Sequence, residues 1–270
     1  MSKNVRAAVC GACGRMGNLI VAKICETDGI ELSAAFDITN VGKDIGEQAR
    51  VGHLGIPVTN PEFMKSVLKE TKTDVMIDFT VASATIENVP KAAEAGVDLI
   101  IGTTGFSDEE KEFIYETVKE NNIRAVLSSN YSIGVNVFFK LLKEAAKELG
   151  DYDIEIIEAH HNKKKDAPSG TAVTAAETIQ NNIKEQKALI YGRSGIAPRE
   201  NEIAIHAIRG GDIVGDHTVL FAGNSERIEI RHQAHTRENF VSGAIRAAKW
   251  IPGKKPGVVY AMKDVLGFDI

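Results

Sequence analysis

The chain has 270 residues, of which 43% are hydrophobic and 26% are charged, and its formal net charge is -5. This composition is typical of a soluble globular protein with one large domain or two of ordinary size. The negative charge argues against a nucleic-acid partner, and no apolar run is long enough to cross a membrane. We therefore expect a protein that binds neither nucleic acid nor a membrane.

The first predicted elements form a dinucleotide-binding pattern. Residues 5–10 are typical of a buried strand, 18–26 of an amphipathic helix and 31–36 of a second strand. Three glycines, each separated by two residues, lie between the first strand and the helix, and Asp37 ends the second strand. Glycines allow a tight turn close to a pyrophosphate, and the acid accepts hydrogen bonds from ribose hydroxyls. The pattern predicts a nucleotide site, although Cys13 occupies the usual middle glycine position.

All three cysteines, Cys10, Cys13 and Cys25, lie in this first unit. An odd, clustered set favours a reducing compartment, and the N-terminus runs directly into the first strand without room for a signal peptide. We therefore expect a cytoplasmic protein. Cys10 and Cys13 have the spacing of a redox or zinc motif, but no second pair follows, and we interpret them as small residues in tight space.

Strand and helix patterns continue to alternate as far as residue 131. We predict strands at 74–78, 97–101 and 123–127, and helices at 83–95 and 107–121. Parallel strands joined by right-handed crossovers end at one edge of the sheet, and open α/β sheets bind ligands at that edge. The segments that we expect to converge there are 11–17, Asp37, 79–80, 102–104 and 128–131.

The pattern changes after residue 131, where strands become dominant. The predicted helices are 135–149, 170–183 and 238–250, and the predicted strands are 154–159, 203–209, 213–221 and 227–234. A run of strands that follows a half in which strands and helices alternate indicates a second, α+β domain. We expect the closing helix to return to the first domain. The predicted domains are therefore 1–130 plus 241–270, and 131–240.

The segment 158–171 carries the strongest chemical signal. His160 and His161 follow a strand, three lysines come next, and Ser169 can cap a helix that Gly170 opens. A helix start attracts anions, so the combination suits a carboxylated substrate that needs a proton. The segment also fits a solvated loop. A metal site is a further alternative because imidazole is a common ligand, but no Cys or carboxylate lies at ligand spacing. We therefore predict no metal.

Taken together, these motifs make the chain resemble the 4-hydroxy-tetrahydrodipicolinate reductase (dihydrodipicolinate reductase) family over essentially its full length. They are Gly-Ala-Cys-Gly-Arg-Met-Gly (11–17), Asp-Phe-Thr (78–80), Gly-Thr-Thr-Gly (102–105), Asn-Tyr-Ser-Ile-Gly-Val-Asn (130–136), Glu-Ala-His-His (158–161), Lys-Asp-Ala-Pro-Ser-Gly-Thr (165–171) and the segment 209–221. The run from the histidine pair to Ser-Gly-Thr is the specific one, since a glycine motif is widespread.

The resemblance implies the NAD(P)H-dependent reduction of 4-hydroxy-tetrahydrodipicolinate, via dihydrodipicolinate, to tetrahydrodipicolinate in lysine and diaminopimelate biosynthesis. It also implies a Rossmann-type, doubly wound parallel sheet with a second α+β domain that binds substrate and builds a homotetramer. His160 matches the catalytic histidine and Lys164 the proton-donating lysine. The positions that match substrate contacts are His161, Ser169, Gly170 and Thr171. Those that match cofactor contacts are Gly11, Ala12, Cys13, Gly14, Arg15, Met16, Asp37, Gly102, Thr103, Thr104, Ser128, Ser129, Asn130 and Tyr131.

The cofactor preference depends on the end of the second strand. Asp37 favours the free ribose hydroxyls of NADH, because a carboxylate repels a 2′-phosphate. Ile38 stands where some family members carry an arginine for that phosphate, and Lys43 is near enough in sequence to substitute. We predict that both NADH and NADPH are used.

Two other functions fit parts of the sequence. One is another two-domain Rossmann oxidoreductase such as an amino-acid dehydrogenase, which would lack the histidine pair with the Ser-Gly-Thr turn. The other is an NAD(P)-sensing regulator, for which we would expect a basic DNA-binding module. Outside the main motifs, His206 and His217 fit packing or surface positions better than ligand positions. Arg209 and Arg237 fit either a carboxylate contact or an ion pair.

Overall fold

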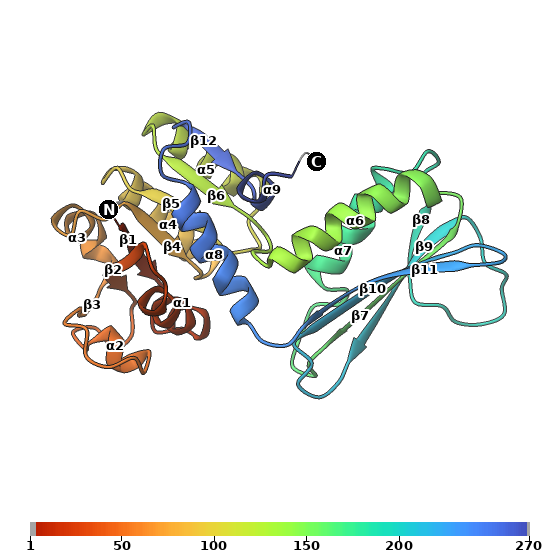
Figure 1. Cartoon of the computed structure of the whole chain (residues 1–270), viewed down its shortest axis with the longest axis horizontal. Coiled ribbons are helices and arrows are strands. Elements are labelled where there is room, and N and C mark those ends of the chain that lie inside the picture. Colours follow the sequence, from red (N-terminus) through yellow and green to blue (C-terminus); the bar gives the residue numbers. More distant parts are fainter. Residues whose placement is uncertain (1–3, 269–270) are drawn as a thin grey trace. The chain divides into compact units, whose positions relative to one another are not determined.

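The computed structural model describes residues 4–268, and the chain divides into two compact units (Figure 1). The first unit contains the residues up to Ser132 together with those from Phe240 onward. The second contains the residues between them. Within the described residues, no helix is long and apolar enough to cross a membrane.

The first unit is built on a seven-stranded sheet in which every neighbouring pair is parallel. The strand order is β12-β6-β5-β4-β1-β2-β3, so the last strand of the chain closes one edge. The strands are β1 (Val5–Cys10), β2 (Ile30–Phe36), β3 (Val58–Thr59), β4 (Val75–Asp78), β5 (Asp98–Ile101), β6 (Arg124–Leu127) and β12 (Val258–Tyr260).

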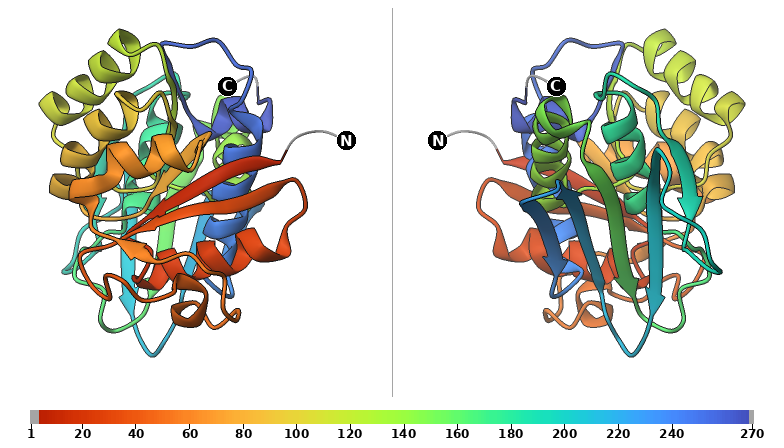
Figure 2. Two further views of the ribbon diagram at one scale, coloured as in Figure 1. Left: turned by 90° about the vertical axis from the view of Figure 1, so that its left-hand side faces the viewer. Right: turned by 90° about the vertical axis from the view of Figure 1, so that its right-hand side faces the viewer.

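Helices cover both faces of this sheet, because the side chains that point to either face of its strands are apolar. Ala7 and Val9 of β1 pack into one cluster with α1 and α8, whereas Ala8 and Cys10 pack into another with α3, α4 and α5. Figure 2, left, shows α1 (red) on one side of β1 and β2 and the helices α3 to α5 (orange to yellow-green) on the other. The helices are α1 (Arg15–Glu26), α2 (Ile45–Gln48), the 3-10 turn η1 (Pro61–Phe63), α3 (Met64–Glu70), α4 (Ala82–Ala93), α5 (Asp108–Glu120), α8 (Glu238–Trp250) and α9 (Met262–Leu266).

The second unit is a mixed five-stranded sheet in the order β11-β10-β7-β9-β8. β10 is antiparallel to β7 and β11, and β9 is parallel to β7 and β8. Both helices of the unit pack against one face, as Figure 1 shows. The elements are α6 (Ile133–Leu149), β7 (Asp153–His160), α7 (Gly170–Gln180), β8 (Ala188–Tyr191), β9 (Glu202–Arg209), β10 (Gly215–Ala222) and β11 (Arg227–Ala234).

This architecture confirms the predicted fold class, and most predicted elements lie within a few residues of their expected bounds. α1 begins at Arg15, three residues before the predicted start, because Gly14 serves as its N-cap. β7 includes His160, one residue beyond the predicted end of the strand. The elements that the sequence did not reveal are the short ones: α2, α3, α9, β3, β8 and β12.

Candidate active site

The turn between β1 and α1 depends on its glycines. Gly11 adopts a φ of 71°, in the left-handed region that favours glycine. Its N–H and that of Ala12 both donate to the carbonyl oxygen of Phe36, at 2.9 and 3.1 Å. A Cβ atom on Gly17 would lie 2.1 Å from the carbonyl oxygen of Gly11. The third glycine therefore lets α1 start directly against the turn.

Asp37 joins the end of β2 to this turn. Its Oδ2 accepts a hydrogen bond from the N–H of Cys13 at 2.9 Å. Its Oδ1 accepts from the N–H and the hydroxyl of Thr39, both at 2.9 Å. Arg15 is exposed at the helix start, and Met16 packs partly against the core. The turn, the helix start and the acid thus form one connected structure, as the sequence pattern indicated.

A buried carboxylate organises the ends of β4 and β5. Oδ1 of Asp78 accepts hydrogen bonds from the N–H and hydroxyl of Thr80, at 2.9 and 2.6 Å, and from the hydroxyls of Thr85 and Thr103, at 3.3 and 3.4 Å. Burial raises the pKa of Asp78, and the hydrogen bonds from Thr80, Asn88 and Thr85 oppose that rise. Thr103 is therefore a buried structural partner, whereas Thr104 beside it is exposed.

Aromatic packing supports the same edge of the sheet. A Cβ atom on Gly102 would lie 2.2 Å from the ring of Phe79, so only glycine fits there without rearrangement. The Phe79 ring lies 5.5 Å from that of Tyr131, whose hydroxyl donates to the carbonyls of Ile101 and Val126. The Tyr131 side chain is therefore in the core. Ser129 is the exposed residue of this last segment.

These segments all follow the carboxyl ends of parallel strands, so the structure brings together the predicted cofactor residues of the first unit.

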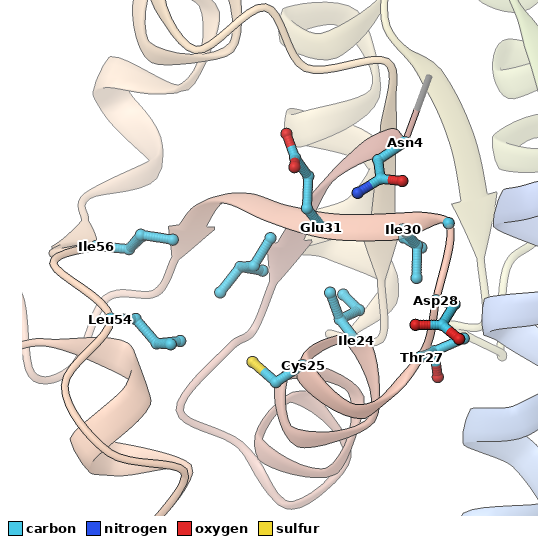
Figure 3. Close-up of a pocket in the computed structure, with 11 residues that line it drawn as sticks. Asn4, Ile24, Cys25, Thr27, Asp28, Ile30, Glu31, Leu54 and Ile56 are labelled. Carbon is cyan, nitrogen blue, oxygen red and sulfur yellow. The ribbon is translucent and has the colours of Figure 1, made fainter. Parts of the chain in front are cut away.

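A hollow of about 900 Å³ lies instead near the amino ends of β1 and β2, where Asn4, Ile30 and Glu31 line it with Ile24 and Leu54 (Figure 3). Because it is at the opposite end of these strands, it is separate from the glycine turn.

In the second unit, the predicted catalytic histidine lies in a buried ionic cluster. Nδ1 of His160 is 2.6 Å from Oε2 of Glu158, whose side chain is 0% exposed. Arg209 on the adjacent strand β9 donates to both carboxylate oxygens, at 2.8 and 2.7 Å. Burial alone would raise the pKa of Glu158, but hydrogen bonds from His160, Arg209 and Ser169 lower it to about 2.

Ser169 connects this cluster to the start of α7. Its N–H donates to Oε1 of Glu158 at 2.9 Å, and its hydroxyl accepts from the N–H of Ala172 at 3.2 Å. The predicted helix cap is therefore present. The Ser169 hydroxyl is also 3.1 Å from Nε2 of His217, whose ring lies 5.2 Å from that of His160. Burial lowers the pKa of His217 to about 4, and this residue is therefore neutral near pH 7.

The loop between β7 and α7 carries the remaining predicted residues. Lys164 donates its backbone N–H to the carbonyl of His161 at 3.1 Å, and its ammonium pairs with Asp166 at 2.9 Å. Nδ1 of His161 is buried and has no hydrogen-bond partner among the described residues. Gly170 and Thr171 form the first turn of α7, next to the Ser169 cap. The structure therefore connects His160, Lys164 and Ser169, through Glu158, Arg209 and Asp166, and places His161, Gly170 and Thr171 next to them in the chain.

Sequence reasoning missed part of this cluster. The sequence indicates Glu158 only as part of a motif, and it leaves Arg209 open between two roles; His217 is buried, as predicted for a packing residue, but its contact with Ser169 is not evident from the sequence. A signal was available for Glu158, because it falls in register with the apolar positions Ile154 and Ile156 of the strand. A charged residue on the apolar face of a strand needs a partner. Among the described residues, no group of three or more His, Cys, Asp or Glu side chains could hold a metal ion.

Comparison with known proteins identifies the family. The model for the N-terminal part of dihydrodipicolinate reductase matches residues 5–131, and that for the C-terminal part matches 134–266. The chain belongs to the dihydrodipicolinate reductase family. The 4-hydroxy-tetrahydrodipicolinate reductase of Methanosarcina mazei is 61% identical, with 97% of this chain and 99% of that protein covered. The enzyme of that name from Methanocaldococcus jannaschii is 51% identical, with 98% of each chain covered.

A solved structure supports the same assignment. The dipicolinate-bound dihydrodipicolinate reductase of Paenisporosarcina sp. TG-14 has a TM-score of 0.78 and 27% identity, and the match covers 97% of this chain and 99% of that one. Membership of the family confirms the predicted oxidoreductase class, the nicotinamide cofactor and the role in lysine and diaminopimelate biosynthesis. All three cysteines are free thiols.

Proposed function

We propose that this chain reduces 4-hydroxy-tetrahydrodipicolinate, through dihydrodipicolinate, to tetrahydrodipicolinate at the expense of NADH or NADPH. The observation that carries the proposal is the cluster in which Glu158 contacts both His160 and the Ser169 cap. It places an imidazole next to a helix start, within a chain whose full-length relatives carry the name of this reductase. This combination suits a small dicarboxylate that receives a proton.

The first unit fits a dinucleotide. The backbone at Gly11 and Gly17 leaves no room for side chains, and Gly14 caps α1 without a side chain of its own, so the amides of the first turn can face a pyrophosphate. Asp37 would face the adenosine ribose. When bound, the cofactor supplies the hydride. We propose that both cofactors are used, since Asp37 suits NADH and the exposed Lys43 ammonium, 3.1 Å from Asn40 Oδ1, could reach a 2′-phosphate.

In the second unit, we propose that Lys164 donates the proton that the reduced substrate needs. Its ammonium is paired with Asp166 on the same loop, so the carboxylate fixes the position of this group. His160 would orient or share that proton through the ring. The proposed carboxylate contacts are the ring of His161 and the helix start at Ser169, Gly170 and Thr171, where the N–H of Ser169 itself is bound to Glu158. Nδ1 of His161 is buried and has no hydrogen-bond partner among the described residues, and it would gain a partner in the bound substrate.

A Lys164→Ala variant tests the proposed activity. We expect it to bind NADH normally but to lose turnover by roughly two powers of ten or more. The assay follows NAD(P)H oxidation with freshly generated substrate, and pyridine-2,6-dicarboxylate should inhibit it competitively. Lys163→Ala is the matched control, because it removes a neighbouring ammonium from the same loop. Turnover of Lys164→Ala equal to that of the control would exclude Lys164 as the acid.

The second unit also carries the surface through which we propose that copies of the chain associate. Its helices cover one face of the five-stranded sheet, and residues such as Ile208, 50% exposed, lie on the other face. We propose that four chains associate through this face and that the first unit serves as the dinucleotide-binding domain. Light scattering should give the mass of four chains. The free cysteines suit the cytoplasm, where we propose that the enzyme works.

A further inference from the structure

We infer that Glu158 is a positioning residue of the reduction, which holds the His160 imidazole and the carboxylate-binding start of α7 in one fixed arrangement. The inference rests on the proposed function and assigns a role to a residue that does not itself meet the reacting atoms. It deepens that proposal, because it explains why the imidazole and the helix start stay together.

Each oxygen of the Glu158 carboxylate has two partners. Oε2 lies 2.6 Å from Nδ1 of His160 and 2.8 Å from a guanidinium nitrogen of Arg209. Oε1 accepts from the N–H of Ser169 at 2.9 Å and from the second guanidinium nitrogen at 2.7 Å. The side chain is completely buried. A shift of this carboxylate would therefore displace the histidine and the helix start together.

The charge of Glu158 selects the tautomer of His160. Because the carboxylate keeps its charge down to a pKa of about 2, it acts only as an acceptor near neutral pH. Nδ1 of His160 must then carry the hydrogen, which leaves Nε2 as the ring nitrogen that can exchange a proton or contact substrate. Nε2 lies beside Gly215 of β10, where a Cβ atom would come within 3.1 Å. The glycine on the neighbouring strand thus keeps a side chain from crowding this nitrogen.

Arg209 extends the arrangement to the proposed proton donor. Besides its paired contacts with Glu158, the guanidinium donates to the carbonyl oxygen of Asp166 at 2.6 Å. The carboxylate of Asp166 in turn pairs with Lys164 at 2.9 Å. Glu158, Arg209 and Asp166 therefore form a continuous connection from His160 to Lys164.

The other groups near the imidazole do not compete for this role. His217 on β10 is buried with a pKa of about 4, so it adds no positive charge near neutral pH. His232 on β11 is also shifted to a lower pKa by burial. The negative charge of Asp216 opposes both shifts but does not outweigh burial. Glu158 is the acid that contacts His160 itself.

A buried ion pair is weak evidence for function by itself, because apolar residues of similar volume often serve stability as well. The decisive variant is therefore Glu158→Gln, which keeps the shape and one oxygen but removes the charge. We expect turnover to fall about tenfold or more, as for other residues that orient a catalytic histidine, while the Kd for NADH stays unchanged.

Nitrogen-15 NMR of labelled histidine gives a readout that a purely structural role would not change. The His160 signal, assigned with a His160→Asn variant, should show hydrogen on Nδ1 in the wild type and a mixture of tautomers in Glu158→Gln. Glu155→Gln is the matched control, because Glu155 lies on the same strand and also contacts a histidine and an arginine, His206 at 2.7 Å and Arg199 at 3.2 Å. Its turnover should equal that of the wild type.

Two results would overturn the inference: turnover of Glu158→Gln within twofold of the wild type, or a loss of turnover with an unchanged His160 tautomer. Where Glu158→Gln fails to fold, Glu158→Asp replaces it. The shorter carboxylate withdraws from Nδ1 of His160, so both turnover and the fixed tautomer should be lost, and full turnover or an unchanged tautomer would contradict the role. The tautomer is measured without substrate, so it also separates this inference from the proposed function, which fails if the wild type reduces no substrate.

Discussion

The backbone N–H of Cys13 donates a hydrogen bond of 2.9 Å to Oδ2 of Asp37, which ties the turn after β1 to the end of β2. Residues 24 positions apart in sequence thus share one hydrogen bond at the predicted cofactor edge. The acid therefore supports the turn, and we propose that it also accepts hydrogen bonds from a ribose.

Replacing Asp37 with Ala should change cofactor preference. The KM for NADH should rise about tenfold, because the hydrogen bonds to the ribose are lost. The KM for NADPH should rise less, since the repulsion of a 2′-phosphate is removed at the same time. Steady-state kinetics with each nucleotide measure the ratio, and an equal change for both would contradict the assigned role of the charge.

A Gly17→Ala variant should weaken the glycine turn. The added Cβ atom would lie 2.1 Å from the carbonyl oxygen of Gly11 and 2.6 Å from Cα of Ala12, so the backbone must move. We expect the free energy of unfolding to fall by about 1–3 kcal/mol. Gly14→Ala is the control, because its Cβ atom would meet only the Gly11 oxygen, at 3.1 Å. Urea unfolding that shows equal losses for both variants would contradict the steric argument.

The buried Asp78 should tolerate an amide better than a truncation. Asp78→Ala would leave the N–H of Thr80 and the hydroxyls of Thr85 and Thr103 without their shared acceptor, at a cost of about 3 kcal/mol in unfolding free energy. Asp78→Asn keeps an oxygen at the same place and should lose much less. Chemical denaturation of the two variants distinguishes them, and equal stability of both would show that the acceptor is dispensable.

Acid should destabilise the protein partly through His217. The folded-state pKa of about 4 lies below the ordinary value of 6.5, so the unfolded chain binds the proton more readily between these values. Stability is therefore fully present above about pH 6.5 and is lost as the pH falls towards 4, by up to about 1.4 kcal/mol per pH unit. A His217→Gln variant should show a shallower slope over this range. Stability curves for the two proteins that run parallel from pH 6.5 to pH 4 would refute this.

Local chemistry explains why much of the site could be predicted. The glycines before α1 and the Ser169 cap act on their own turns, so their spacing alone indicates their structure. The regular alternation of strands and helices likewise placed most of the first sheet. These features require no knowledge of distant neighbours.

The parts that could not be predicted depend on distant pairs. Glu158 meets Arg209 only because β7 and β9 lie side by side, with His160 opposite Arg209 in the register. His217 approaches Ser169 across 48 positions of sequence. β12 has three residues, too few for a periodic pattern, and its position depends on pairing with β6. The sequence therefore predicts the reactive residues better than it predicts the long-range contacts that position them.

The contribution of α8, α9 and β12 to the first unit has a consequence for synthesis on the ribosome. Val241, Ala244 and Ile245 of α8 pack with β1, and β12 completes the far edge of the sheet. β1 must therefore wait for α8 and β12 to be synthesised before this core is complete, whereas the described residues of the second unit form one continuous segment. We expect the middle of the chain to mature first and the two ends to close afterwards, opposite to the usual N-terminal-first order.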